Sequence, residues 1–194
     1  MTGQIPDEFL YKDERYAIAG ISGGSLFNPE DFDLKPHSSC TACWRGYQAF
    51  FNVIENHLVI DTLYINIEET KILNNKKPKK LSKSSKDPYR SFFKFHYPGL
   101  MLKLNFSGTI LLAKDFIDSM YVHMGFQKPI AYETVIELKF EKGKLIEAVD
   151  KSELYAKNRE QDSSKGAQPE TYENKDVKEW IGDTFSLDYD SEEE

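Results

Sequence analysis

Two runs of alternating apolar residues, separated by a short polar break, constrain the fold of this chain more than any other feature. The first run places large side chains on one face, and the second continues with the same period after residues 55–57. The aligned positions are Tyr47, Ala49, Phe51 and Val53, followed by Leu58, Ile60, Thr62 and Tyr64. Alternation of period two with aromatic and β-branched residues is typical of strands, so residues 44–67 are predicted to form a β-hairpin.

Further strand pairs are predicted on both sides of this hairpin. Residues 131–150 alternate around a turn that contains Gly143, and residues 9–21 flank a turn at Asp13. Apolar runs over residues 102–113 predict more strands. The chain is therefore predicted to be mainly β, as a single antiparallel meander that closes into a small barrel or sandwich, with at most one or two short helices.

Two short segments depart from the strand pattern. Asn28 and Pro29 are suited to start a helical turn, with Asn28 as its cap. The apolar residues of 116–124 fit either a strand or a short helix, so their spacing leaves both open.

Charge and aromatic content divide the chain into a β-rich globular domain at residues 1–150 and an acidic tail at residues 151–194. The tail carries 6 Lys and Arg against 13 Asp and Glu, and it is predicted to be largely disordered, with a candidate docking segment at residues 177–188. Within the domain, residues 71–90 carry 8 Lys and Arg against one Asp and lack periodicity. They are predicted to form a Lys-rich loop.

No stretch of the sequence is apolar enough to cross a membrane. The longest apolar run covers only residues 110–113, and residues 1–13 are mixed polar and acidic, without the apolar core of a signal peptide. We therefore expect a cytoplasmic protein without a membrane partner.

The two cysteines, Cys40 and Cys43, form a single CxxC pair. They are too close together to staple a fold, and a redox motif would need them at the start of a helix, whereas residues 44–47 are predicted to be a strand. A zinc site would add His37 and one further ligand, but the sequence lacks a second matched pair. The candidates for that further ligand are His57, His96 and His123. We favour two buried or strand-edge cysteines and predict no metal and no cofactor.

The sequence carries no recognisable catalytic pattern. Its Gly/Ser cluster at residues 22–25 lacks a P-loop lysine, and no serine lies in a nucleophile elbow. The paired carboxylates at residues 68–69 and 192–194 lie in loop or tail, where nothing would raise a pKa. No catalytic residue is predicted, and a non-enzymatic role is favoured while enzyme activity is left open.

The basic stretch at residues 71–90 is a candidate for contacting phosphates, because its cations would give binding a steep salt dependence. It lacks aromatic residues before Tyr89, and the rest of the chain is acidic. A solvated loop is therefore the favoured interpretation. Docking of an acidic partner, or of the protein's own tail, is a second use.

One apolar island interrupts the acidic tail. Its residues are Trp180, Ile181, Phe185 and Leu187. The island has two interpretations: it folds back over an apolar groove of the domain, or it anchors a partner protein as a short motif.

Two motifs, TACWRGY at residues 41–47 and YVHMGF at residues 121–126, resemble a family of small bacterial proteins of unknown function. The lead-in at residues 5–11 and 26–30 is also similar, and the resemblance covers about residues 5–150. It implies no catalytic residues. It implies either a shared groove near the two motifs or an aromatic corner with an arginine packed over a ring. The groove candidates are Trp44, Arg45, Gly46, Tyr47 and His123.

Three functions are compatible with these observations. The first is a non-enzymatic protein-binding module of the bacterial cytoplasm, of the immunity or inhibitor kind. The second is a small-molecule-binding barrel or enzyme, which predicts that Arg45, Tyr47 and His123 converge in a pocket. The third, ranked last, is nucleic-acid binding through the lysines of residues 76–86.

Overall fold

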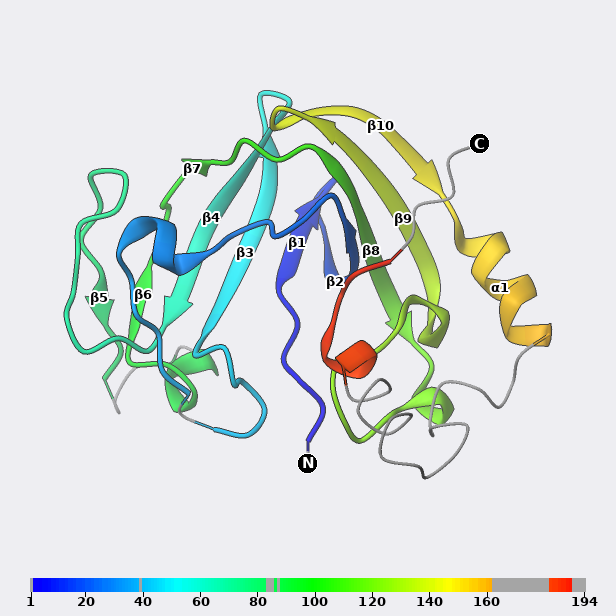
Figure 1. Ribbon diagram of the computed structural model, residues 1–194, viewed down its shortest axis with the longest axis horizontal. Coiled ribbons are helices and arrows are strands. Elements are labelled where there is room, and N and C mark those ends of the chain that lie inside the picture. Colours follow the sequence, from blue (N-terminus) through cyan, green and yellow to red (C-terminus); the bar gives the residue numbers. More distant parts are fainter. Residues whose placement is uncertain (1, 39, 83–85, 87, 162–181, 190–194) are drawn as a thin grey trace.

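The computed structural model describes residues 2–38, 40–82, 86, 88–161 and 182–189, and the strands in this part of the chain join in one sheet (Figure 1). The first five strands are β1 (Glu8–Tyr11), β2 (Glu14–Ser22), β3 (Tyr47–Ile54), β4 (His57–Ile65) and β5 (Lys79–Lys80). The others are β6 (Phe95–Tyr97), β7 (Leu102–Lys103), β8 (Gly108–Phe116), β9 (Tyr132–Glu141) and β10 (Lys144–Asp150). Their order is β10-β9-β8-β2-β1-β3-β4-β6-β5, and β7 pairs with β4. The predicted mainly β fold is confirmed.

The sheet closes on itself where β10 meets β4. Lys144 lies opposite His57, and the Leu145 N–H donates to the Asn56 carbonyl at 3.1 Å. Seven strands therefore form a ring, which closes where the tip of the β3–β4 hairpin meets the tip of the β9–β10 hairpin. The pair of β1 with β3 is parallel, because the chain crosses over through residues 23–46 before β3 begins.

Three of the turns explain why these residues form hairpins. In each turn both central residues have positive φ, which is the geometry of a type I′ turn and matches the twist of the strands. The pairs are Lys12 and Asp13, Glu55 and Asn56, and Lys142 and Gly143. The hairpins predicted over residues 9–21, 44–67 and 131–150 are confirmed, although the second is shorter than expected.

Helical structure is short. The 3₁₀ segments are η1 (Pro29–Phe32), η2 (Pro88–Ser91), η3 (Asp118–Met120) and η4 (Pro129–Ala131). The α-helical residues are α1 (Ser152–Gln161) and a single turn at residues 182–185. The Asn28 side chain accepts from the Glu30 N–H, as predicted for a cap. In the described residues no helix is long and apolar enough to span a membrane.

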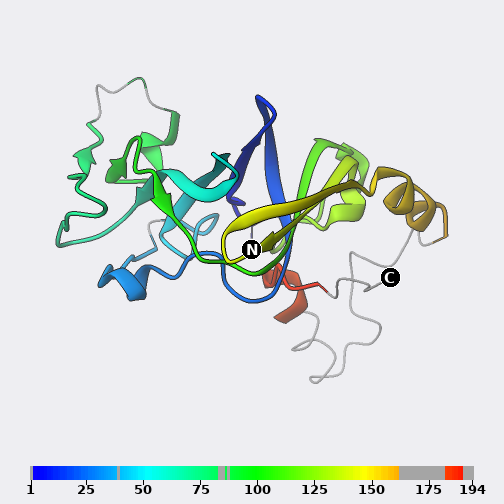
Figure 2. The ribbon, with the colours of Figure 1, turned by 90° about the horizontal axis from the view of Figure 1, so that it is seen from above.

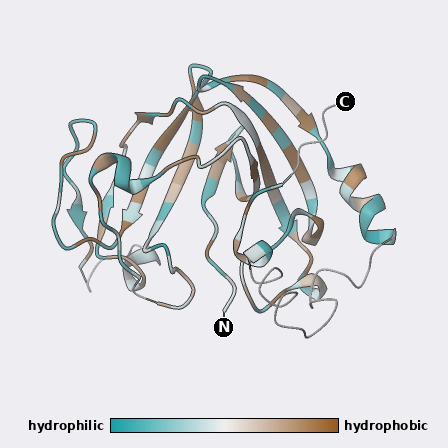
Figure 3. Cartoon of the chain, viewed as in Figure 1, coloured by the Kyte–Doolittle hydropathy of each residue, from teal (hydrophilic) through white to brown (hydrophobic). Residues whose placement is uncertain are grey.

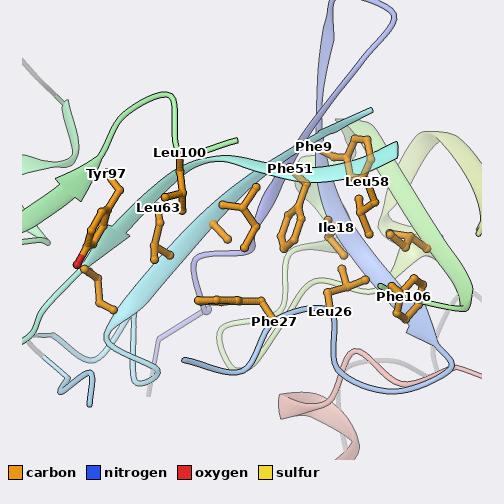
Figure 4. Close-up of a cluster of buried hydrophobic side chains, with 14 of the residues drawn as sticks. Phe9, Ile18, Leu26, Phe27, Phe51, Leu58, Leu63, Tyr97, Leu100 and Phe106 are labelled. Carbon is orange, nitrogen blue, oxygen red and sulfur yellow. The ribbon is translucent and has the colours of Figure 1, made fainter. Parts of the chain in front are cut away.

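The core lies inside the ring. Apolar residues alternate with polar ones along the strands (Figure 3), and the buried side chains face one another across the interior (Figure 4). Leu26, Phe27 and Leu34, from the crossover, join this cluster. The interior is thus filled with side chains.

A β-bulge at Asp61 corrects the predicted alternation along β4. Phe50 pairs with Thr62 but Phe51 pairs with Ile60, so Asp61 is an extra residue. The bulge reverses the faces beyond it: Leu63 joins the core in place of Thr62 and Tyr64. The side chain of Tyr64 instead belongs to a cluster on the outer face.

The predicted strand at residues 44–47 is also wrong, because Trp44 and Arg45 lie in a turn and β3 begins at Tyr47. Gly46 explains this start. Its φ is +71°, and a Cβ at this position would lie 2.3 Å from the His37 carbonyl oxygen. The chain therefore changes direction at a residue that has to be glycine.

Contacts with the domain continue past residue 150, where the tail was expected to start. The helix α1 packs on the outer face of β9, with Tyr155 against a second apolar cluster and Arg159 donating to the carbonyl of Tyr132 at 2.6 Å. Figure 2 shows α1 and β5 at opposite ends of the molecule.

Candidate functional site

The two family-like motifs meet at one end of the ring, on either side of the N-terminal segment. The Gln4 N–H donates to the Gly125 carbonyl at 2.7 Å, and the Gln4 side chain donates to the Thr41 carbonyl at 2.9 Å. The Ile5 N–H donates to Ala42 at 2.8 Å. Residues 2–7 therefore tie the two motifs together.

Arg45 forms a bidentate ion pair with Asp7, with N–O distances of 2.8 and 3.1 Å. Its guanidinium lies 4.8 Å from the Tyr47 ring centroid and 5.4 Å from that of Phe126. Burial disfavours its charge, but Asp7 outweighs burial and raises the pKa of Arg45. Asp7 also accepts from the Ala49 N–H at 2.8 Å. The arrangement is an arginine packed over aromatic rings and held by a buried carboxylate.

The other two groove candidates lie at the surface of this corner. His123 is exposed and packs edge-on against the Tyr121 ring, with centroids 4.8 Å apart. Trp44 is 54% exposed and stacks on Phe185, with centroids 5.4 Å apart. The structure thus brings Trp44, Arg45 and Tyr47 together around the turn. The ring of His123 packs against Tyr121 instead.

Cys40 and Cys43 are thiols in the turn that precedes β3. Cys43 is buried, its sulfur lies 3.3 Å from the Tyr47 carbonyl, and burial raises the pKa of its thiol. A raised pKa disfavours the reactive thiolate. In the described part of the chain, no group of three or more His, Cys, Asp or Glu side chains could hold a metal ion.

The segment Gly182–Tyr189 lies against the ring beside β2. The Ile21 N–H donates to the Leu187 carbonyl at 2.7 Å, and the Tyr189 N–H donates to the Ile21 carbonyl at 3.3 Å. The Phe126 N–H donates to the Thr184 carbonyl at 2.9 Å. The segment is therefore held by main-chain bonds at both ends.

Side chains of the body reach the same segment. The Lys128 ammonium donates to the carbonyls of Asp183 and Ser186 at 2.6 and 3.2 Å, and Leu187 packs against the core. The Tyr189 hydroxyl donates to Glu137 at 2.9 Å. Of the predicted island, Leu187 makes the core contact and Phe185 stacks on Trp44, whereas Trp180 and Ile181 lie outside the described residues.

The described part of the tail and the Lys-rich loop contact different parts of the sheet. Gly182–Tyr189 lies beside β2, in the middle of the strand order, whereas β5, within the loop, pairs with β6 at one end of that order. Docking of the tail on the loop is therefore not the arrangement that these residues adopt (Figure 1).

Sequence reasoning missed one pocket, on the outer face of β1, β3 and β4. It has a volume of about 160 Å³, and its lining includes Phe50, Tyr64 and Tyr89 with the charged residues Glu8 and Arg15. The sequence does contain a sign of this pocket. The apolar positions of the strand are even-numbered before Asp61 (58 and 60) and odd-numbered after it (63 and 65), which indicates that Tyr64 faces outward.

The fold and these contacts define a mainly β protein with a closed ring of strands, to which the segment Gly182–Tyr189 of the same chain is bound. Comparison of the chain with protein-family models, with curated proteins and with solved structures gives no match. The resemblance to a bacterial family therefore rests only on the two sequence motifs and the similar lead-in at residues 5–11 and 26–30.

Docking of the segment should weaken at alkaline pH through Tyr189. Burial, the largest cause, raises the pKa of its hydroxyl above the ordinary 10.0. The neutral phenol is thus favoured in the folded protein, so its contribution to stability is present below about pH 10 and is lost as the pH rises through the raised pKa. Urea unfolding of wild type and Tyr189→Phe should show a stability difference that shrinks above pH 10. A constant difference from pH 8 to 11 would contradict this, because the other tyrosines are common to both proteins.

Proposed function

We propose that the protein is a non-enzymatic protein-binding module of the bacterial cytoplasm. Its peptide site is the groove beside β2 that Gly182–Tyr189 occupies, and a partner segment of similar chemistry takes the place of this segment. Such a segment would carry an aromatic residue in place of Phe185, an aliphatic residue in place of Leu187 and a tyrosine in place of Tyr189. The observation that carries the proposal is the main-chain pairing of Leu187 and Tyr189 with Ile21.

The length of β1 leaves room for this pairing. In the described residues, β1 has four residues and its register with β2 ends at Ala17. Beyond that point, Ile21 uses its N–H and carbonyl groups to pair with the C-terminal segment. Addition of a strand to an available sheet edge is a common mode of peptide recognition, in which main-chain bonds give affinity and side-chain pockets give specificity.

Two glycines shape the groove for its occupant. A Cβ on Gly20 would lie 2.9 Å from the Tyr189 ring, and a Cβ on Gly125 would lie 2.1 Å from the Thr184 carbonyl oxygen. Together with Trp44 under Phe185, they give the groove a surface that selects particular residues. Aromatic residues near the centre of an interface often carry much of its binding energy.

The proposal predicts that the segment can be exchanged. A protease site placed between residues 162 and 181 of the full chain allows the chain to be cut there after folding. A fluorescent peptide of residues 182–194 should then bind the cut protein, as followed by anisotropy, and should bind the uncut protein far more weakly because the attached segment is present at an effective concentration near the millimolar range. Phe185→Ala in the peptide should raise its Kd about tenfold or more.

Matched variants separate recognition from a purely structural role. Asp183→Asn in the peptide should change the Kd little, because Asp183 is exposed and uses its carbonyl oxygen. Gly125→Ala should abolish binding, whereas Gly99→Ala, also at positive φ but with open space around it, should not. If the cut fragment never leaves and no labelled peptide enters, the segment is a fixed part of the fold and the proposal fails.

The competing functions have less support from the same geometry. The guanidinium of Arg45 is committed to Asp7, and the ring interior is filled by the core, so a ligand near Arg45, Tyr47 and His123 would have to compete with existing contacts. Nucleic-acid binding through the Lys-rich loop stays a prediction of the sequence.

A further inference from the structure

The outer-face pocket is formed by rings that the fold turns away from the core. Phe50 of β3, Tyr64 of β4 and Tyr89 of η2 lie with ring centroids 4.9–5.5 Å apart. Tyr64 reaches this face because the bulge at Asp61 reverses the alternation of β4. Bulges of this kind often lie beside functional sites, where they redirect a side chain.

Among the described residues that line the pocket, acidic side chains outnumber basic ones. They are the acidic residues Glu8 and Asp61 and the basic residue Arg15. The Tyr89 hydroxyl donates to Glu8 at 2.8 Å, which holds the ring and the carboxylate in one orientation. The described lining thus combines an aromatic wall with two carboxylates and one guanidinium.

Arg15 shows how a positive group lies in this environment. Its guanidinium is 5.9 Å from the Phe50 ring centroid and 3.3 Å from the Glu8 carboxylate, while its side chain is 70% exposed. An exposed ion pair of this kind contributes little and is displaced at small cost.

We propose that this pocket binds an organic cation with a methylated ammonium head. The electron-rich ring faces attract positive charge, and the methyl groups contact the rings without the tight hydration shell of a bare ammonium. Glu8 and Asp61 supply the countercharge, and Arg15 moves aside. The proposal is independent of the peptide groove, which lies beside β2 on residues that do not line this pocket.

The probe is choline chloride, titrated into the ¹⁵N-labelled full chain at constant ionic strength, with amide chemical shifts as the readout. Residues of β1, β3 and β4 around the pocket should shift with a Kd in the millimolar range. The neutral isostere 3,3-dimethylbutan-1-ol should bind about tenfold more weakly, since it keeps the shape and loses the charge. Free trimethyllysine should bind like choline if the head group alone is recognised.

Variants distinguish a cation site from its alternatives. Arg15→Gln should tighten choline binding about threefold, because it removes the competing cation, whereas an anion site would be lost in this variant. Tyr89→Ala should weaken binding about tenfold, and Tyr89→Phe, which keeps the ring, should retain most of it. Tyr121→Ala, in the motif at residues 121–126 that does not line the pocket, is the control and should leave the Kd unchanged.

Three results would overturn the proposal. They are equal binding of the neutral isostere, loss of choline binding in Arg15→Gln, and the absence of pocket shifts at about 50 mM choline, where a millimolar site would be nearly saturated.

Discussion

Replacing Asp7 by alanine should lower the free energy of unfolding by about 3–5 kcal/mol, the usual loss when one partner of a buried ion pair is removed. The Asp7 side chain is 8% exposed and that of Arg45 is 27% exposed, so the arginine would lose its countercharge in a largely dehydrated corner. The Ala49 N–H would lose its acceptor as well. Urea unfolding at pH 7 measures the change.

A second pair and a double variant serve as controls. Asp33 pairs with Lys71 at 3.3 Å, but its side chain is 85% exposed, so Asp33→Asn should cost less than about 1 kcal/mol. Combining Asp7→Ala with Arg45→Met should cost clearly less than the two single changes added together, because neither charge is then left alone. Additive losses would show that the two residues stabilise the corner separately.

Replacing Phe9 by alanine should cost a similar amount, about 3–5 kcal/mol, for a different reason. Phe9 is fully buried at the centre of β1, and its ring stacks on Phe51 with centroids 6.3 Å apart. β1 joins β2 to β3 in the ring, so a cavity here loosens both neighbours. Urea unfolding of the variant measures the loss.

The adjacent residue provides the matched control. Leu10 follows Phe9 in the same strand but points outward and is 38% exposed. Leu10→Ala should therefore cost no more than about 1 kcal/mol, and Phe9→Leu should recover more than half of the stability that Phe9→Ala loses. Equal losses at positions 9 and 10 would mean that the strand, rather than the ring of Phe9, is what the substitutions disturb.

The hairpins were predictable because local chemistry specifies them. Alternation along 47–54 and 132–141 carries the strand signal, and Asn28 and Pro29 carry the helical-turn signal. The bulge at Asp61 was missed because strict alternation was assumed, although one inserted residue reverses every later side chain. The parallel pairing of β1 with β3 depends on a long crossover, and local patterns do not report such pairings.

The sites were harder to predict than the strands. Arg45 was selected by its motif, but its role depends on Asp7, which lies in another element and has no local link to it. Tyr64 and Tyr89 are far apart in sequence and meet on the outer face only through tertiary packing. For the tail island, the sequence left two roles open: docking on the domain and binding a partner. Phe185 and Leu187 contact the domain, and this position is compatible with both roles.

Closure of the ring has a consequence for how the chain reaches its native state. The hairpin tips that join β4 to β10 are brought together by Asn56 and Leu145, which are 89 residues apart. Closing so long a loop costs entropy before its contacts form, so the two hairpins should form first and the seam should form late. Until then β10 has only β9 as its strand partner and presents an exposed edge, so folding at high protein concentration would favour pairing between molecules over closure within one.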